Sequence, residues 1–212
     1  MEFDAYFFDF DGTLGATEPD IRAAWLAAIR KLGLPEEEFA ERFRVGPPIS
    51  ETSRMLFPDL PPRRRELLLT TYKSFYDDSD RYRAVPYPGV KDMLKRVCDA
   101  GKKCYVVTNK RVKPLKKLMD LFAFTPLCHG IYPPDLLDRV NHLKKDALLA
   151  LALSVSGVAP ERALMVGDTE LDVGCGKACG TKTCGVTWGY GEMRLLKNSA
   201  PDFLISDPAD LP

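Results

Sequence analysis

Residues 7–15 read FFDFDGTLG, an aromatic run that ends in two acids and a Gly-Thr pair. The interior of a strand normally excludes charge, so Asp9 and Asp11 indicate the place where a strand stops. Side chains two residues apart on a strand lie on the same face, and the two carboxylates can therefore converge on one spot. The sequence predicts a strand over 5–10 with a polar site at its end.

Most of the remaining chain alternates between short β-type runs and helical stretches. Further strands are predicted over 103–108, 163–167, 182–187 and 202–205, and helices over 90–100, 112–122, 146–156 and 170–179. This alternation is typical of βαβ units, in which helices cover both faces of a parallel sheet. We therefore predict an α/β fold with a Rossmann-like parallel sheet.

Residues 15–84 interrupt this alternation with helical segments only. Helices are predicted over 19–32, 36–43, 50–57 and 62–76, with proline-containing joints between them. The chain returns through VPYPG, residues 85–89, which is a stiff, turn-forming linker. We therefore predict a core domain of residues 1–14 and 85–212 and an inserted, movable helical cap of residues 15–84.

Asp9 and Asp11 are candidate ligands for a divalent cation. Two close carboxylates repel each other, and one is driven towards its protonated form unless a cation lies between them. Ligation by carboxylate oxygens suits Mg²⁺, which usually binds a substrate phosphate as well. Gly12 allows a tight backbone turn, and its N–H can face an anion. The alternative for this stretch alone is a turn with solvated acids.

Two further polar clusters follow predicted strands. VGDTELD, residues 166–172, places Asp172 one helical turn beyond Asp168, and VVTNK, residues 106–110, places Thr108 and Asn109 at a strand end. Asp168 alone can also be read as a helix N-cap followed by a solvated acid. Because ligands bind beyond the carboxyl ends of parallel strands, the three clusters together predict one site.

These clusters carry a resemblance to a known family. DFDGT, VVTN and GDTELD resemble the first, second and fourth motifs of the haloacid dehalogenase superfamily, and the helical insert resembles its C1-type cap. RVGPPISET, residues 44–52, and PYPGVKDMLKRV, residues 86–97, are similar to segments of its phosphoglycolate-phosphatase-like branch. The resemblance covers nearly the whole chain.

The resemblance implies a role for each acid. Asp9 is then the nucleophile that forms an aspartyl-phosphate, and Asp11 is the general acid and later the base. It further implies that Mg²⁺ is held by Asp9, the backbone carbonyl of Asp11 and Asp168, with Asp172 in or next to the coordination shell.

The resemblance also implies residues that bind the phosphoryl oxygens. Thr108 and the amide of Asn109 are two of them, and the third is a lysine near the start of a helix. In NHLKKDALLAL, residues 141–151, Lys144 is the better match and Lys145 the second choice. Many relatives carry Lys-Pro here, and the alternative is a solvated lysine pair. A second departure is Ala16-Thr17, where many relatives carry Asp-Ser.

The implied function is a Mg²⁺-dependent phosphatase for a small phosphomonoester, such as phosphoglycolate or another metabolite or nucleotide phosphate. The alternatives are a phosphotransferase similar to β-phosphoglucomutase and a non-catalytic binding protein on the same fold. The segment 46–50, GPPIS, is the candidate cap loop that enters the site.

Composition limits the partners. Lys plus Arg and Asp plus Glu number 30 each, so the chain lacks the basic surplus of a general nucleic-acid binder. No apolar run approaches the roughly 20 residues that cross a bilayer, and the N-terminus lacks secretory features. We expect a cytoplasmic monomer or homodimer that binds a small phosphorylated metabolite, with no nucleic acid and no membrane, and whose six cysteines stay reduced.

Overall fold

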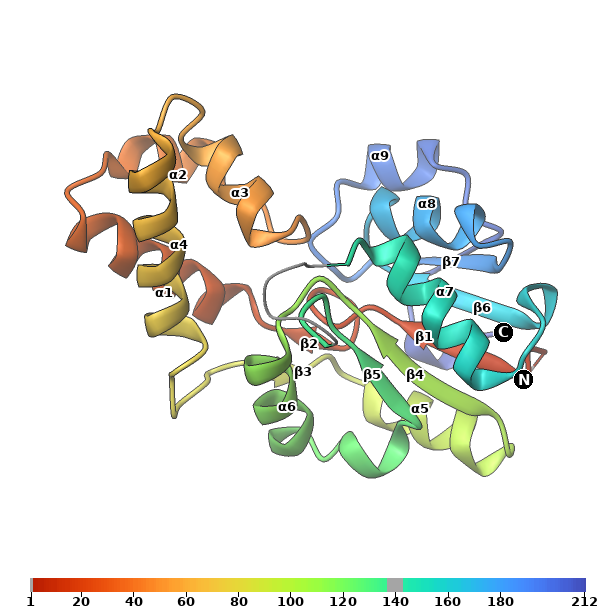
Figure 1. Cartoon of the computed structure of the whole chain (residues 1–212). Coiled ribbons are helices and arrows are strands. Elements are labelled where there is room, and N and C mark those ends of the chain that lie inside the picture. The colour runs from red at the N-terminus through yellow and green to blue at the C-terminus, as the bar shows by residue number, and fades with distance from the viewer. Residues whose placement is uncertain (1, 137–142) are drawn as a thin grey trace.

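A computed structural model describes residues 2–136 and 143–212. Its centre is a six-stranded sheet in which every neighbouring pair of strands is parallel (Figure 1). Across the sheet the order is β5 (Gly130–Tyr132), β4 (Lys103–Val107), β1 (Ala5–Phe8), β6 (Ala163–Gly167), β7 (Lys182–Val186) and β8 (Phe203–Ile205). The α/β, Rossmann-like fold class predicted from the sequence is confirmed.

The three central strands end at the same edge of the sheet. Phe8 of β1 pairs with Val106 of β4 and with Val166 of β6. Every residue of β1 is buried, because the strand has neighbours on both sides and helices on both faces. The polar residues that follow these three strands are therefore delivered to one edge.

Helices cover both faces of the sheet. On one face, α5 (Val90–Asp99) and α6 (Val112–Leu121) pack on a core that includes Phe8 and Val106. On the other, α7 (Lys145–Ser156) and α8 (Glu170–Ala178) pack on a core that includes Phe7 and Met165. The alternation of side chains along β1 thus supplies both cores. The short helix α9 (Met193–Asn198) follows β7.

Four helices between β1 and α5 form a separate body beside the sheet (Figure 1). They are α1 (Glu18–Lys31), α2 (Glu36–Arg42), α3 (Ile49–Leu56) and α4 (Pro62–Tyr76). We call residues 18–76 the helical insert. It has its own buried cluster, in which the rings of Trp25 and Tyr72 stack with centroids 4.3 Å apart. The antiparallel pair β2 (Gly15–Ala16) and β3 (Val85–Pro86) lies where the chain leaves and re-enters the core.

The sequence-based prediction missed three kinds of element. It missed the strand β5, which has three residues, the helix α9, which has six, and the strands β2 and β3, which have two each. Such short elements have too few residues to show a hydrophobic period. The same holds for the 3₁₀ turns Thr125–Leu127, Pro160–Arg162 and Pro208–Asp210. The strand predicted over 5–10 ends earlier, at Phe8. Within the described residues, no helix combines the length and the apolar character needed to cross a membrane.

Candidate active site

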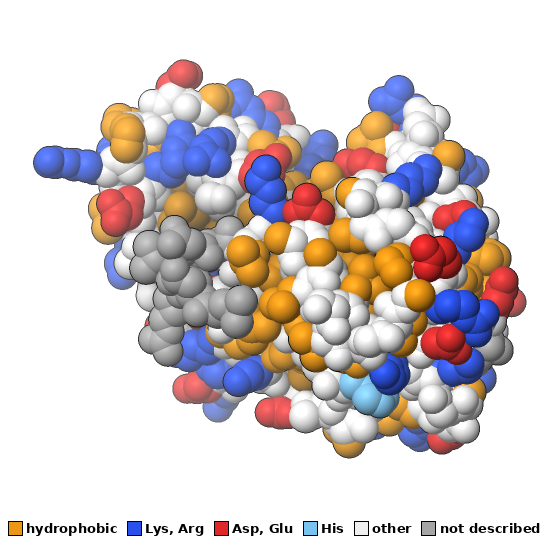
Figure 2. All heavy atoms as spheres, turned by 45° about the vertical axis from the view of Figure 1, so that its right-hand side comes forward, with side chains coloured by type: hydrophobic (Ala, Val, Ile, Leu, Met, Phe, Trp, Pro, Cys, Tyr) orange, Lys and Arg blue, Asp and Glu red, His pale blue; other side chains and the backbone are white. Residues whose placement is uncertain are grey.

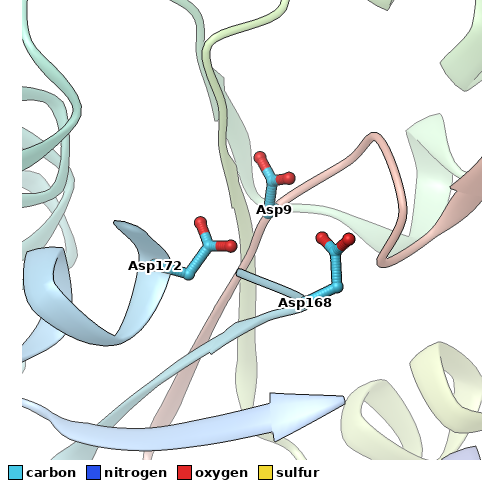
Figure 3. Close-up of side chains that lie close together, drawn as sticks. All are labelled: Asp9, Asp168 and Asp172. Carbon is cyan, nitrogen blue, oxygen red and sulfur yellow. The ribbon is translucent and has the colours of Figure 1, made fainter. Parts of the chain in front are cut away.

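Three carboxylates form the centre of the candidate site (Figure 3). Asp9 follows β1, Asp168 follows β6, and Asp172 lies in the first turn of α8. All three residues are buried, and each offers an oxygen within 4.8 Å of the others. The sequence motifs that contain Asp9, Asp168 and Asp172 are thus brought to one point, at the edge of the sheet where the central strands end.

Local hydrogen bonds orient Asp172 and Asp9. The Asp172 carboxylate accepts from the backbone N–H and the hydroxyl of Thr169, at 3.0 and 2.7 Å, in the capping box that begins α8. The backbone N–H of Asp9 donates to the carbonyl of Val166 at 2.9 Å, which continues the β1–β6 ladder by one residue. The Asp172 side chain and the Asp9 backbone are therefore fixed by the ends of regular elements.

Asp168 is held by two loops. Thr13 donates its hydroxyl to one carboxylate oxygen at 3.1 Å, and the backbone N–H groups of Tyr190 and Gly191 donate to the other at 2.7 and 3.2 Å. A Cβ on Gly191 would lie 1.9 Å from the carbonyl oxygen of Asp168, and one on Gly12 would lie 2.2 Å from its carboxylate. These two glycines let the backbone approach Asp168 closely.

The three buried charges disfavour one another. Burial raises the pKa of Asp9 to about 6, although Lys145 opposes this change while Asp172 adds to it. Burial also raises the pKa of Asp168 to about 8, and the charges of Asp172 and Asp9 act in the same direction. A divalent cation would remove this repulsion, and a set of carboxylate oxygens is what Mg²⁺ prefers. The donor chemistry of the cluster therefore fits Mg²⁺.

Asp11 is not part of the cluster. Its carboxylate accepts from the ammonium of Lys110 at 2.8 Å and from the hydroxyl of Thr17 at 2.6 Å. The Asp11 carboxylate lies outside the group formed by Asp9, Asp168 and Asp172, because β1 ends at Phe8 and the alternation of a strand no longer holds at position 11. Asp11 and Asp9 still line one pocket, together with Thr108.

The predicted phosphate-binding residues lie at the same edge. Thr108 is buried directly after β4, where its hydroxyl accepts from the backbone N–H of Lys110 at 3.2 Å. Asn109 donates its side-chain amide to the carbonyl of Gly46 in the helical insert, at 3.1 Å. Gly46 belongs to the predicted cap loop, so this loop does reach the strand ends.

The structure brings Lys145, rather than Lys144, to the cluster. The Lys145 ammonium lies 2.6 Å from a carboxylate oxygen of Asp9 and also contacts Asp172, whereas Lys144 is exposed at the N-cap of α7. Burial alone would lower the pKa of Lys145, but the charges of Asp172 and Asp9 outweigh burial and raise the pKa above its ordinary value. The amine therefore stays charged. The structure therefore favours the second choice, Lys145, over Lys144, because sequence alone does not fix which way the first turn of α7 faces.

A pocket lies between the helical insert and the strand ends. The insert contributes an aromatic wall, which includes Trp25, Phe43, Tyr72 and Tyr76. Neither these residues nor Lys110, which also lines the pocket, was predicted from the sequence to belong to the site. The available signal was the position of Lys110 directly after the VVTN motif.

The sequence matches the family model for haloacid dehalogenase-like hydrolases over residues 6–186. The chain belongs to this family. The match begins within β1 and ends at the last residue of β7, so it includes the whole carboxylate cluster. The protein is accordingly a haloacid dehalogenase-like hydrolase, as the sequence motifs implied.

Named relatives of this haloacid dehalogenase-like hydrolase are phosphatases. A phosphoglycolate phosphatase of Aquifex aeolicus is 31% identical over 96% of this chain and 92% of its own length. Pyrophosphatase PpaX of Bacillus pumilus is 32% identical over 96% of this chain and 92% of its own. A solved haloacid dehalogenase-like hydrolase of Streptococcus pneumoniae superimposes with a TM-score of 0.85 at 26% identity, covering 99% of this chain and 96% of that one.

Proposed function

We propose that the protein is a Mg²⁺-dependent phosphatase that hydrolyses a small phosphomonoester through an aspartyl-phosphate on Asp9. The observation that carries this proposal is the buried cluster of Asp9, Asp168 and Asp172 with the Lys145 ammonium beside it. Phosphoryl transfer depends mainly on positioning and countercharge, and this cluster offers both. The phosphatase relatives support the same reaction class.

The proposed chemistry has two displacements at phosphorus. In the first, a carboxylate oxygen of Asp9 attacks phosphorus while the bond to the leaving oxygen breaks, and Asp11 gives that oxygen its proton. In the second, water attacks the aspartyl-phosphate, Asp11 takes a proton from the water, and the Asp9 carboxylate is regenerated. Bound Mg²⁺, held by Asp9, Asp168, Asp172 and the backbone carbonyl of Asp11, would supply countercharge to the phosphoryl oxygens.

The remaining residues of the strand ends bind the phosphoryl group in this proposal. The Thr108 hydroxyl and the Asn109 amide serve as donors. The backbone N–H of Gly12, predicted from the sequence to face an anion, instead donates to the carbonyl of Gly15 at 3.0 Å. Lys145 takes the role of the phosphate-neutralising lysine, since its ammonium already contacts Asp9. This assignment replaces Lys144.

We also propose that residues 15–84 act as a cap on a core of residues 1–14 and 85–212. The pocket between the two parts lies over Asp9 and Asp11, so its walls would contact the leaving group. One relative is named a phosphoglycolate phosphatase and another, at similar sequence identity, a pyrophosphatase. In this proposal the cap determines which substrate is accepted. A cytoplasmic location is consistent with the free thiol of each cysteine.

The test is phosphate release from a panel of phosphate esters that includes p-nitrophenyl phosphate, phosphoglycolate, pyrophosphate, sugar phosphates and nucleotides. We expect activity with Mg²⁺ and loss of activity with a chelator. Asp9→Asn removes the nucleophile and should abolish turnover with every ester. Turnover without metal, or an Asp9→Asn variant as active as the wild type, would contradict the mechanism.

A further inference from the structure

Lys110 is a buried amine that the proposed chemistry does not use. It follows Asn109 just after β4 and is 6% exposed. A buried ammonium is costly unless it is paired, and this one has two partners from different parts of the chain. It lies 2.8 Å from one carboxylate oxygen of Asp11, Oδ1, and donates to the hydroxyl oxygen of Tyr76. It also lies 4.7 Å from the centre of the Tyr76 ring.

The contacts of Asp11 distinguish its two carboxylate oxygens. Oδ1 accepts from Lys110 and also from the Thr17 hydroxyl at 2.6 Å. Within residues 2–136 and 143–212, no residue donates to Oδ2. Two donors on one oxygen fix the orientation of the carboxylate, and they leave Oδ2 as the oxygen able to carry a proton towards the pocket that Asp11 lines.

The second partner of Lys110 belongs to the helical insert. Tyr76 is the last residue of α4 and is 4% exposed, and its ring stacks on Tyr72 with centroids 5.6 Å apart. The Lys110–Tyr76 hydrogen bond therefore joins the strand ends of the core to the body of the insert. Withdrawal of the insert would break it and would leave the Lys110 ammonium with one partner fewer.

We propose that Lys110 is a positioning residue that orients Asp11 for proton transfer through Oδ2, and that Tyr76 makes this orientation depend on the insert being docked. The proposal rests on the proposed function. While the phosphorus–oxygen bond of the ester breaks and the Asp9–phosphorus bond forms, the proton moves from Oδ2 to the leaving oxygen, which departs as the alcohol. In the second displacement, Oδ2 accepts the proton of the attacking water.

A positioning role predicts a dependence on the leaving group. An alkoxide needs a proton as it leaves, whereas p-nitrophenolate is stable without one. Hydrolysis of the aspartyl-phosphate is common to both esters, so the comparison uses kcat/KM, which reports the first displacement alone. A variant that misplaces Oδ2 should therefore lose kcat/KM on an alkyl phosphate far more than on p-nitrophenyl phosphate. A merely structural defect would lower both rates by the same factor.

The experiment compares Lys110→Met and Tyr76→Phe with the wild type on p-nitrophenyl phosphate and on the alkyl phosphate most readily hydrolysed in the ester panel. For Lys110→Met we expect kcat/KM to fall roughly 100-fold on the alkyl ester and less than about 10-fold on the aryl ester. For Tyr76→Phe, which removes one oxygen atom, we expect the same pattern at about 5-fold on the alkyl ester. Equal losses on both esters, or no loss, would overturn the proposal.

Two control variants isolate the contact. Lys117→Met removes another lysine of the core that reaches the chain just beyond the insert, where its ammonium donates to the carbonyl of Ser79 at 2.6 Å. Tyr82→Phe removes a tyrosine hydroxyl that donates to the Tyr76 carbonyl at 2.7 Å. Neither residue contacts Asp11, so both variants should keep the wild-type ratio of the two rates. The Lys110→Met pattern in either control would contradict the assignment.

A crystal structure of Lys110→Met provides a readout that needs no turnover. We expect the Asp11 carboxylate to rotate away from its wild-type orientation, and an unchanged carboxylate would overturn the proposal. A wild type that hydrolyses no ester would refute the phosphatase function, and this crystallographic comparison would still test the positioning role. If Lys110→Met does not fold, the rates and the crystal structure of Tyr76→Phe test the proposal in its place.

Discussion

The two adjacent lysines at the start of α7 differ sharply in environment. Lys145 contacts Asp9 and Asp172, whereas Lys144 is exposed. We expect Lys145→Met to lower kcat by roughly 100- to 1000-fold, the usual effect of removing a group that stabilises charge in a transition state. Lys144→Met should remain within about 2-fold of the wild type, as is usual for a solvated surface residue. Steady-state kinetics on one ester measures both, and a reversal of the two effects would return the role to Lys144.

Gly191 permits the close approach of its loop to Asp168. Because a Cβ there would lie 1.9 Å from the Asp168 carbonyl oxygen, Gly191→Ala must displace backbone next to the carboxylate cluster. We expect it to lower both activity and the free energy of unfolding, the latter by more than about 1 kcal/mol. Gly174→Ala is the matched control, since a Cβ on this residue of α8 meets nothing within 4 Å. The control should stabilise the protein by about 0.5–1 kcal/mol, and denaturant unfolding compares the two variants.

At the scale of elements, the period of the hydrophobic residues and the polar residues at strand ends predicted the positions of the long helices and strands well. The helix predicted over 62–76 has the bounds of α4, and the strand predicted over 163–167 has those of β6. Short elements such as β5 were missed, because three residues at a sheet edge carry no period. The contacts of Lys110 with Asp11 and Tyr76 were equally out of reach. They depend on how the insert docks, which no local pattern encodes.

Whether a cysteine faces the core or the surface also determines how reactive its thiol is. Cys104, Cys175 and Cys184 are buried in the sheet and α8, and the other three cysteines are partly exposed. Burial raises the pKa of Cys175 and of Cys184 to about 12, so almost no thiolate is present at pH 8. We expect Ellman's reagent at pH 8 to leave these three thiols unmodified until denaturant is added. Rapid labelling of all six in the native protein would contradict the packing.

At the scale of the whole molecule, the carboxylate cluster links stability to pH and to metal. The folded-state pKa values of Asp9 and Asp168, about 6 and about 8, lie above the ordinary value of 3.8. The folded protein therefore binds more protons than the unfolded chain, and the stability that these groups contribute is lost as pH rises from about 4 to about 8. We expect Mg²⁺ at the cluster to reverse this loss, because it would counter the charges.

Thermal unfolding in the presence of a chelator or of excess Mg²⁺ tests this linkage. With chelator present, we expect the Tm of the wild type to fall between pH 5 and pH 8. At pH 8, added Mg²⁺ should raise the Tm by several degrees, because each kcal/mol of stabilisation by binding raises it by about 2–4 °C. Asp168→Asn should show a smaller pH effect and little response to Mg²⁺. An equal response of the wild type and this variant would exclude the cluster as the metal site.

The whole molecule is balanced in charge. Lys/Arg and Asp/Glu side chains are interspersed on the face that Figure 2 shows, in keeping with the equal totals of 30. Several ion pairs join the core to the chain at the end of the insert, among them Arg111 with Asp77 at 3.0 Å.

The central claim is that Asp9 receives the phosphoryl group beside a cation held by Asp168. The most direct measurement is a crystal structure of the protein grown with Mg²⁺ and beryllium fluoride, which mimics a phosphoryl group on a carboxylate. The account predicts beryllium bonded to a carboxylate oxygen of Asp9 and Mg²⁺ within coordination distance of Asp9 and Asp168. Beryllium fluoride on another residue, or a cation bound away from this cluster, would contradict it.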